Sequence, residues 1–396
     1  MSKKIPEIFF NNMFECNSFA CHCTKDIENV APGQPPRTTL KLYADENQPL
    51  RFAYAPKYGL NQTGVAGGAI EKNILGKILA LPDDDIDSCI SFIEHFGFLL
   101  PVKNSEYESV DSEVLLKLIN KIKATIHLMN AIAGNKNYKN ILIMTAYLLY
   151  SNPIEISLSD YTYTSCCHKF TELIRSYNYF PDLNRNQEVF ENGTYSVPDT
   201  LTGNNAPVDI NFFNAVRSGS DTSLEGSNDP DFKNLVAMYT GLLSENDDLR
   251  IIIDFFYHYQ TNVGIFKKTQ YNRIRYYSTP NKDNFSDDMK AALLKIARIV
   301  ISEEINHNIK GIHPKYNAEE LAPTWQVNNL LQALYFSIFY MKPGIEIYKQ
   351  CKNQNCKRDR FFLVEATRTN KEYCCIQCSR AAASQRYRSR HLNKQK

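Results

Sequence analysis

Four cysteines near the end of the chain constrain its fold more than any other feature of the sequence. They follow the pattern Cys351-x4-Cys356-x17-Cys374-x3-Cys378. Two close cysteine pairs about 15–20 residues apart are typical of structural zinc sites. The spacing of Cys374 and Cys378 places both sulfurs on one face if this segment is helical. The pattern therefore predicts that these four residues hold one zinc ion.

The residues between the two pairs predict how the site is built. Residues 361–364 are typical of a strand, 369–371 of a hairpin turn, and 372–373 of the start of a return strand. A knuckle, a hairpin and a helix in this order are the layout of a treble-clef finger. A closed shell of four sulfurs makes the zinc structural, and its binding would supply much of the folding free energy. Cys375 is an alternative to Cys374, because Cys375 and Cys378 also form an acceptable pair.

A basic helix is predicted directly after the last cysteine. Residues 381–383 are three alanines, which favour a helix, and arginines surround them. Arginine suits phosphates and guanine edges, and tyrosine adds a stacking or sugar contact. We therefore expect this helix to bind nucleic acid, with double-stranded DNA as the favoured partner. The predicted contact residues are Arg380, Arg386, Tyr387, Arg388, Arg390 and Lys394.

The charge is distributed unevenly along the chain. Residues 346–396 contain 13 basic and 4 acidic side chains, a net charge of +9, whereas the rest contains 32 and 39, a net charge of −7. A basic end on an acidic body is typical of proteins that bind polyanions. The alternatives are a solvated basic tail and a helix that docks on the acidic body of the same chain.

The remainder of the chain predicts a mainly α fold of the α+β type. With 396 residues and 43% hydrophobic content, the chain can bury a core and form two or three domains. Residues 38–43 and 50–54 predict two strands, which form a small β element near the N-terminus. Apolar residues at helical spacing predict helices over 86–96, 110–133, 138–150, 231–243, 247–259, 286–309 and 325–341.

These patterns divide the chain into three parts. Residues 1–36 form an N-terminal segment, 37–344 a mostly helical domain, and 345–396 the finger with its basic helix. Residues 181–230 are rich in Asn, Asp, Ser, Gly and Pro, and predict a long polar loop within the helical domain.

The sequence predicts a cytoplasmic protein without a membrane partner. The longest apolar run, 330–341, is interrupted by Gln332 and is shorter than the roughly 18–20 residues of a membrane span. Residues 1–7 show no apolar core of a signal peptide. In such a compartment the 11 cysteines are thiols or metal ligands rather than disulfides.

A second group of thiols lies in the N-terminal segment. Cys16, Cys21, His22 and Cys23 are close enough to suggest a metal or redox site. A second set of ligands is missing nearby, and residues 166–168, Cys-Cys-His, could supply it only through long-range folding. Buried or incidental thiols are the favoured interpretation.

No motif predicts catalysis. Residues 64–68 are glycine-rich but lack the Lys-Ser/Thr ending of a phosphate loop. Arg386-x4-His391 formally fits a motif of helical ribonucleases, but it lies in the basic helix, where such a match arises by chance. We therefore name no catalytic residue and expect a binding protein rather than an enzyme.

The C-terminal residues resemble the CGNR-type zinc finger of bacteria. That family has a C-x4-C knuckle, an aromatic strand, an aromatic-Cys step, a final cysteine and an arginine-rich helix. After the last cysteine the family has Gly-Asn-Arg, whereas this chain has Ser379-Arg380-Ala381, a departure that concerns base reading and not the metal ligands. The matching residues are Cys351, Cys356, Phe361, Phe362, Tyr373, Cys374, Cys375, Cys378 and residues 386–390.

The resemblance extends more weakly upstream. Residues 284–345 and parts of 40–100 look like the helical ABATE domain that precedes the finger in this family, whereas 110–280 match nothing. The resemblance implies a bacterial, stress-type, DNA-binding transcriptional regulator whose helical domain senses an unidentified small molecule. Because one small module gives a small footprint on DNA, we also expect a homodimer or a second contact surface.

Two other classes of function stay open. In the first alternative, the chain is an enzyme or toxin that the finger delivers to nucleic acid. In the second, it is a protein-interaction module whose basic helix binds an acidic partner. A steep salt dependence of duplex binding would argue against the protein-interaction module.

Overall fold

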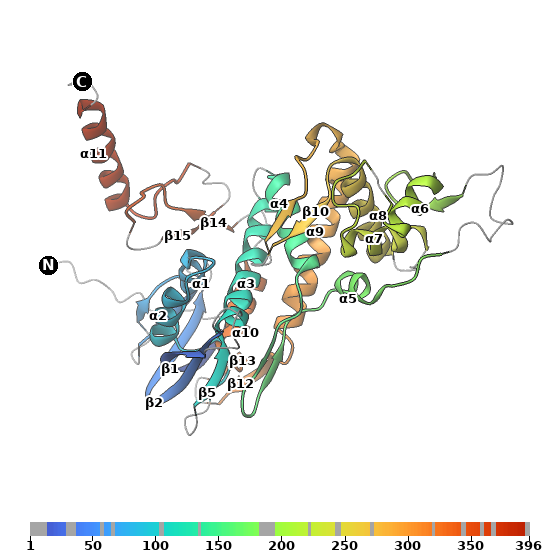
Figure 1. Ribbon diagram of the computed structural model, residues 1–396. Coiled ribbons are helices and arrows are strands. Elements are labelled where there is room, and N and C mark those ends of the chain that lie inside the picture. The colour runs from blue at the N-terminus through green and yellow to red at the C-terminus, as the bar shows by residue number, and fades with distance from the viewer. Residues whose placement is uncertain are drawn as a thin grey trace. The chain divides into compact units, whose positions relative to one another are not determined.

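The protein folds into two compact units (Figure 1). The first unit contains Met1–Asn135, Ile154–Ser165 and Glu304–Lys396, and the second contains Lys136–Pro153 and Cys166–Glu303. This computed structural model describes residues 14–28, 37–55, 59–64, 68–102, 107–133, 136–181, 195–220, 223–241, 247–269, 273–318, 321–341, 346–356, 360–365 and 370–392.

A mixed sheet forms the centre of the first unit. Two long antiparallel strands, β1 (Phe14–Glu28) and β2 (Arg37–Ala55), form its middle. The strand order is β12-β13-β1-β2-β3-β4, and β5 also pairs with β2. β13 runs parallel to β1 and the other pairs are antiparallel. The shorter strands are β3 (Gly59–Thr63), β4 (Ala69–Glu71), β5 (Glu108–Asp111), β12 (His313–Asn317) and β13 (Ala322–Val327).

Alternating burial explains the two long strands. Leu40, Leu42 and Ala44 of β2 are buried, with exposed or half-buried residues between them, as a sheet with one face on the core requires. β1 alternates in the same way, but its register shifts between Phe19 and Ala20. Residues 46–48 of β2 have no partner in β1 at this point and form an irregularity of the bulge type, which bends a strand.

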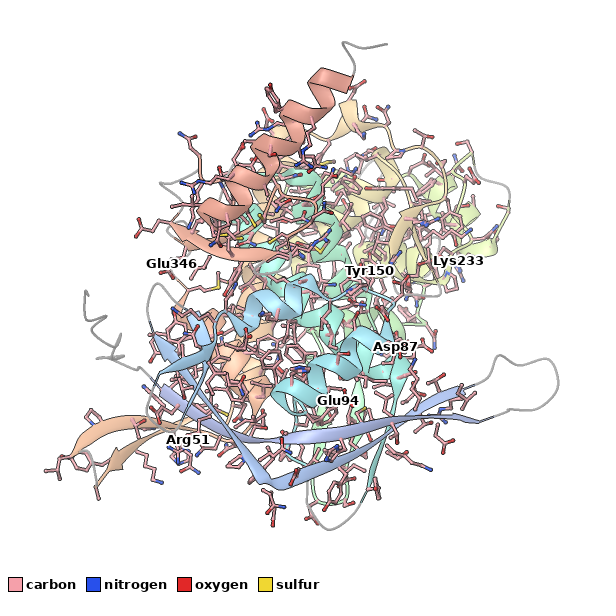
Figure 2. All side chains as sticks on the ribbon, turned by 90° about the vertical axis from the view of Figure 1, so that its left-hand side faces the viewer. Arg51, Asp87, Glu94, Tyr150, Lys233 and Glu346 are labelled. Atoms are coloured by element: carbon pink, nitrogen blue, oxygen red, sulfur yellow. The ribbon has the colours of Figure 1, made fainter. Side chains whose placement is uncertain are left out.

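The helices of the first unit pack beside this sheet. They are α1 (Ile74–Ala80), α2 (Ile86–Phe96), α3 (Ser112–Ala133) and α10 (Leu330–Tyr340). Asp85 caps α2 by accepting from the amides of Asp87 and Ser88 at 3.0 and 3.3 Å, and Gly97 ends it with φ +80°. Asp87 also pairs with Lys25 of β1, and Figure 2 shows Asp87 on this helix.

Helices form most of the second unit. They are α4 (Tyr138–Tyr150), α5 (Lys169–Ser176), α6 (Ile210–Ser218), α7 (Pro230–Thr240), α8 (Asp247–Asn262) and most of α9 (Asp287–Asn308). Aromatic rings fill its core, where Tyr150 meets Phe170 and Phe256 edge-on at 5.3 and 5.4 Å. Two hairpins complete it, β8 (Ser196–Pro198) with β9 (Asn205–Pro207), and β10 (Phe266–Lys268) with β11 (Ile274–Tyr276). The first unit has its own small hairpin of β6 (Glu155–Ser157) and β7 (Thr162–Thr164).

The prediction of a mainly α fold is wrong. Of the residues that the structure describes, 46% are helical and 26% lie in strands, and a large mixed sheet is present. Residues 38–43 and 50–54 were expected to be two short strands but belong to one strand, β2, because β1 pairs with β2 on both sides of its unpaired polar residues 46–48. Trp325 was expected to begin a helix but lies in β13, and α10 begins five residues later at Leu330.

The last part of the first unit, which we call the C-terminal module (residues 346–392), begins with a two-stranded sheet. β14 (Glu346–Gln350) pairs antiparallel with β15 (Phe361–Glu365), and α11 (Ile376–Leu392) follows. Figure 2 labels Glu346 at the start of β14. The module is hydrogen-bonded to the rest of the unit. The Asn130 side chain donates to the Tyr348 carbonyl at 3.2 Å and accepts from the Tyr348 amide at 3.0 Å.

A second anchor lies at the start of α1. Asn73 adopts a left-handed conformation, φ 62°, and its Oδ1 accepts from the Gly76 amide at 3.0 Å. Its Nδ2 donates to the carbonyl of Phe361 in β15 at 2.7 Å. A Cβ atom at Gly76 would lie 2.6 Å from that same carbonyl oxygen, so this position requires glycine.

We therefore predict that Gly76→Ala destabilises the protein although alanine favours a helix. The methyl group would displace β15 and break the Asn73 bond, at a cost of about 1–3 kcal/mol in the free energy of unfolding. The measurement is urea unfolding followed by circular dichroism. Gly68→Ala is the control, because a Cβ there meets nothing within 4 Å. Equal stability of Gly76→Ala and the wild type would contradict the close approach.

Candidate metal centre

The structure brings together the four cysteines that the spacing predicted. Cys351 directly follows β14, Cys356 ends the turn after it, Cys374 precedes α11, and Cys378 lies in the first turn of α11. Their four sulfur atoms lie within 4.8 Å of one another. The Sγ–Sγ distances are 3.6 Å from Cys356 to Cys374, 3.5 Å from Cys374 to Cys378, and 3.7 Å from Cys378 to Cys356.

These distances fit a metal ion with four sulfur ligands. Metal–sulfur bonds of about 2.3 Å in a tetrahedron place the sulfurs about 3.8 Å apart. The three separations among Cys356, Cys374 and Cys378 are close to that value, and the sulfur of Cys351 lies within 4.8 Å of each, so the four thiols could hold one ion. The distances do not distinguish among metals that share this geometry.

The backbone of the first knuckle positions Cys351 and Cys356. The Cys351 amide donates to the Arg360 carbonyl at 2.7 Å, and the Cys356 amide donates to the Asn353 carbonyl at 3.0 Å. The Asn353 side chain accepts from the Asn355 amide at 3.2 Å, which closes the turn. Asparagine at position 353 thus folds the chain back so that both sulfurs face one point.

Amide groups favour the ligand form of Cys351. Burial raises the pKa of this thiol, but the amides of Cys374 and Asn353, together with the thiols of Cys374 and Cys356, outweigh burial and lower the pKa below its usual value. A thiolate is the form that binds metal. The knuckle therefore prepares a negative sulfur beside the other thiols.

A small apolar cluster supports the sulfur atoms. Cys351 and Cys378 are buried with Ile347, Phe362 and Val364, and the half-buried Tyr373 packs against them. Tyr373 was expected to begin a return strand, but residues 370–373 are not in a strand, because β15 pairs with β14 instead. The knuckle therefore lies within the connection between β14 and β15. Part of the predicted hairpin turn, residues 366–369, lies outside the described residues.

Cys375 lies beside the group of four. Its sulfur is 3.8 Å from that of Cys374 and 3.9 Å from Oε1 of Gln377. The group whose sulfurs all lie within 4.8 Å contains Cys374 and not Cys375. The structure therefore favours Cys374 over the alternative that the spacing left open.

The predicted nucleic-acid contacts lie on α11. Arg380, Arg386 and Arg388 are exposed, and 65% of Tyr387 is exposed. The side chain of Arg390 and all of Lys394 lie outside the described residues. The inward side of the helix is marked by Cys378 and Ala382, which are buried.

The N-terminal thiols belong to the sheet rather than to a metal site. Cys16, Cys21 and Cys23 of β1 are buried, whereas His22 between them is exposed on the other face. Burial raises the pKa of Cys16 and of Cys23 to about 12, so both thiols stay protonated. Among the described residues, no metal-ligand group includes these cysteines.

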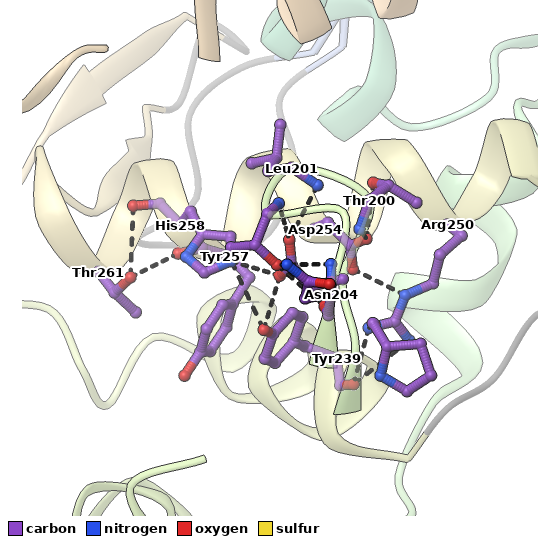
Figure 3. Close-up of polar contacts among 12 residues, drawn as sticks. Thr200, Leu201, Asn204, Tyr239, Arg250, Asp254, Tyr257, His258 and Thr261 are labelled. Atoms are coloured by element: carbon purple, nitrogen blue, oxygen red, sulfur yellow. Dashed lines mark hydrogen bonds and ion pairs between the residues drawn. The ribbon is translucent and has the colours of Figure 1, made fainter. Parts of the chain in front are cut away.

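A buried polar cluster in the second unit was not predicted (Figure 3). Oδ2 of Asp199 lies 2.5 Å from Nε2 of His258 and accepts from the Tyr239 hydroxyl at 2.8 Å. Its other oxygen accepts from the amides of Leu201 and Thr202 at 2.8 and 2.9 Å. Four donors therefore surround one carboxylate, which fixes the turn after β8 against α7 and α8.

A second carboxylate extends this cluster. Asp254 accepts from the amide and the hydroxyl of Thr200 at 2.8 and 2.7 Å, and it pairs with Arg250 at 2.7 Å. The sequence signal was weak, because Asp199 lies in the segment 181–230 that was predicted to be a polar loop. Residues 182–194 and 221–222 of that segment lie outside the described residues, and the described part contains β8, β9 and α6.

We predict that the wild-type protein binds one metal ion per chain through Cys351, Cys356, Cys374 and Cys378. Serine at any of these positions removes a thiolate and should reduce the bound metal to well below one ion per chain. Cys375→Ser is the matched control and should keep the full metal content. The measurement is elemental analysis of the purified, dialysed full chain. Metal loss from Cys375→Ser with retention by Cys374→Ser would reverse the assignment.

The Asp199 cluster predicts a specific dependence of stability on pH. Burial raises the pKa of Asp199, but the bonds from His258 and the Thr202 amide outweigh burial, so the pKa lies well below its usual value. A carboxylate with a lowered pKa stabilises the fold fully above pH about 4, where the unfolded chain is also ionised, and this contribution is lost as pH falls.

Asp199→Asn should therefore lower the free energy of unfolding by about 1.5–3 kcal/mol at neutral pH. The difference from the wild type should narrow as pH falls below about 4. Urea unfolding at several pH values measures both effects, with the exposed Asp283→Asn as the control. A difference that does not change with pH would show that the charge of Asp199 is not what stabilises this turn.

Neither the comparisons with known proteins nor the hydropathy of the helices adds information about this site. Among the helices that the structure describes, none combines the length and the hydropathy that a membrane span requires. The chain matches no family model, no curated protein and no solved structure.

Proposed function

We propose that this chain is a zinc-dependent nucleic-acid-binding protein that contacts duplex DNA through α11. The main support for this proposal is that an exposed, arginine-rich helix begins at the group of four cysteines. The resemblance to bacterial CGNR-type fingers supports a role in transcriptional regulation. A homodimer and a small-molecule ligand stay predictions.

The donor set supports zinc as the resident ion. Four thiolates in tetrahedral geometry are the ligands that zinc prefers in structural sites. Zinc would join the knuckle to the first turn of α11, and all four positions around it would be filled by Cys351, Cys356, Cys374 and Cys378. The ion would therefore hold the helix in place and take no part in a reaction.

The charge of α11 supports a polyanionic partner. Residues 376–392 contain four arginines and no acidic residue. In the part of the chain that the structure describes, Arg380 and Arg388 form no ion pair, so both guanidinium groups are available to a ligand. Arginine binds phosphate with two parallel hydrogen bonds, which makes such a helix suited to nucleic acid.

Fluorescence anisotropy of the zinc-loaded full chain with labelled random duplex DNA tests this proposal. We predict binding that weakens steeply between about 50 and 200 mM salt, because phosphate contacts release counterions. The triple variant Arg380→Gln, Arg386→Gln and Arg388→Gln should bind at least ~10-fold more weakly, with a smaller salt slope. The cysteines are untouched in this variant, so its zinc content should stay at one ion per chain.

The matched control changes exposed arginines of the second unit. Arg217→Gln with Arg298→Gln removes charge from exposed positions elsewhere and should leave DNA binding unchanged. Binding that is lost equally in both variants would indicate a general charge effect. Wild-type protein that binds no DNA, but binds an acidic peptide, would favour a protein partner and contradict the proposal.

A further inference from the structure

The exposed surface of α11 has a centre and two flanks. Each residue of a helix turns by about 100°, so positions can be compared with Cys378, which faces inward. Tyr387 then lies about 180° from Cys378, and Arg380 about 200°. Ile376 and Ala383 fall on the same outward side. The sequence spacing of these four residues therefore makes one stripe along the outward face.

This central stripe is well exposed. The exposed fractions are 71% for Ile376 and 65% for Tyr387, and Arg380 and Ala383 are also exposed. Two exposed side chains do not mark an interface by themselves, but Ile376 and Tyr387 lie on the same face as Arg380 and leave that face accessible to a partner. The small side chain of Ala383 in the middle lets a partner approach the helix closely.

One arginine lies on each flank of the stripe. Arg386 is about 80° from Cys378 in one direction, and Arg388 about 80° in the other. Arg386 is held on its side, because its Nε donates to the Ala382 carbonyl at 3.3 Å. The two flanking arginines therefore extend on opposite sides of the helix, with the stripe between them.

We propose that the central stripe of α11 enters the major groove of B-form DNA, and that the flanking arginines contact phosphates of the two opposite strands. This inference rests on the proposed function and assigns roles within it. Arg380 and Tyr387 would contact base edges and determine sequence preference. Arg386 and Arg388 would supply affinity that does not depend on sequence.

The dimensions of nucleic-acid grooves favour this partner. The major groove of B-DNA is about 12 Å wide and admits a helix with its side chains. The major groove of an RNA duplex is too deep and narrow for side chains to read. A guanidinium group at the centre of the groove suits guanine, and an apolar ring suits the methyl group of thymine.

The two sets of residues should fail in different ways when they are changed. Loss of a base contact lowers the preference for the best site by roughly 5–150-fold, and affects random DNA little. Loss of two phosphate contacts weakens binding to all sequences and reduces the salt slope by about 1.8.

The experiment begins with selection of the preferred duplex from a random pool by the zinc-loaded full chain. Anisotropy then compares the selected duplex, random duplex DNA and duplex RNA at several salt concentrations. The variants are Arg380→Gln with Tyr387→Ala, Arg386→Gln with Arg388→Gln, and the control Arg217→Gln with Arg298→Gln. Zinc content verifies that each variant keeps its folded centre.

The expected result is that the stripe variant loses sequence preference and keeps its salt slope, while the flank variant keeps preference and loses slope. The inference is overturned if the wild type binds without sequence preference, if duplex RNA binds as tightly as duplex DNA, or if the two variants exchange these effects. In each of these cases nucleic-acid binding itself persists. Complete absence of binding by the wild type is a different result, which contradicts the proposed function as well.

Discussion

The close packing of four sulfur atoms is the constraint on which the C-terminal module depends. Three of its sulfur pairs are separated by only 3.5–3.7 Å. Two unit charges about 4 Å apart near a protein surface repel each other by about 4 kcal/mol, so several thiolates cannot share this space alone. Structural zinc contributes about 10–16 kcal/mol, which is enough to reverse the balance.

This constraint extends from the sulfurs to the helix. Two of the four sulfurs, those of Cys374 and Cys378, belong to the start of α11, and the other two belong to the knuckle that follows β14. The two strands of the module, β14 and β15, are in turn hydrogen-bonded to the rest of the first unit through the side chains of Asn130 and Asn73. A chain of specific contacts therefore connects the sheet of the first unit with the base of the helix. That rigidity is what a helix needs if its outward stripe is to meet a groove in one orientation.

The sequence was sufficient for the cysteine group and insufficient for the strand pairing, both within the module and in the large sheet. Close cysteine pairs are a local signal, and the helix over 138–150 was likewise predicted from local spacing, because it coincides with α4. The sheet, by contrast, depends on pairing between distant segments. β1 contacts β13 about three hundred residues away, with Glu15 opposite Gln326, and no local pattern indicates that partner. Propensity also failed at Trp325, where pairing with β12 outweighs the helical signal. The Asp199 cluster was missed for the same reason, since its donors come from three separate elements.

The cysteines themselves show why residue type alone cannot identify a ligand. The thiols of β1 and the thiol of Cys351 are all largely removed from water, and burial alone raises the pKa of each. The difference is that two backbone amides and two neighbouring thiols hydrogen-bond to the sulfur of Cys351 and lower its pKa, whereas burial dominates for Cys16 and Cys23. The amides of Asn353 and Cys374 can point at this sulfur because neither residue lies in a paired strand, where the amides are used by the neighbouring strand. A thiol in the middle of this long hairpin is therefore a small apolar side chain, whereas the thiol of Cys351, at a knuckle, could bind a metal ion.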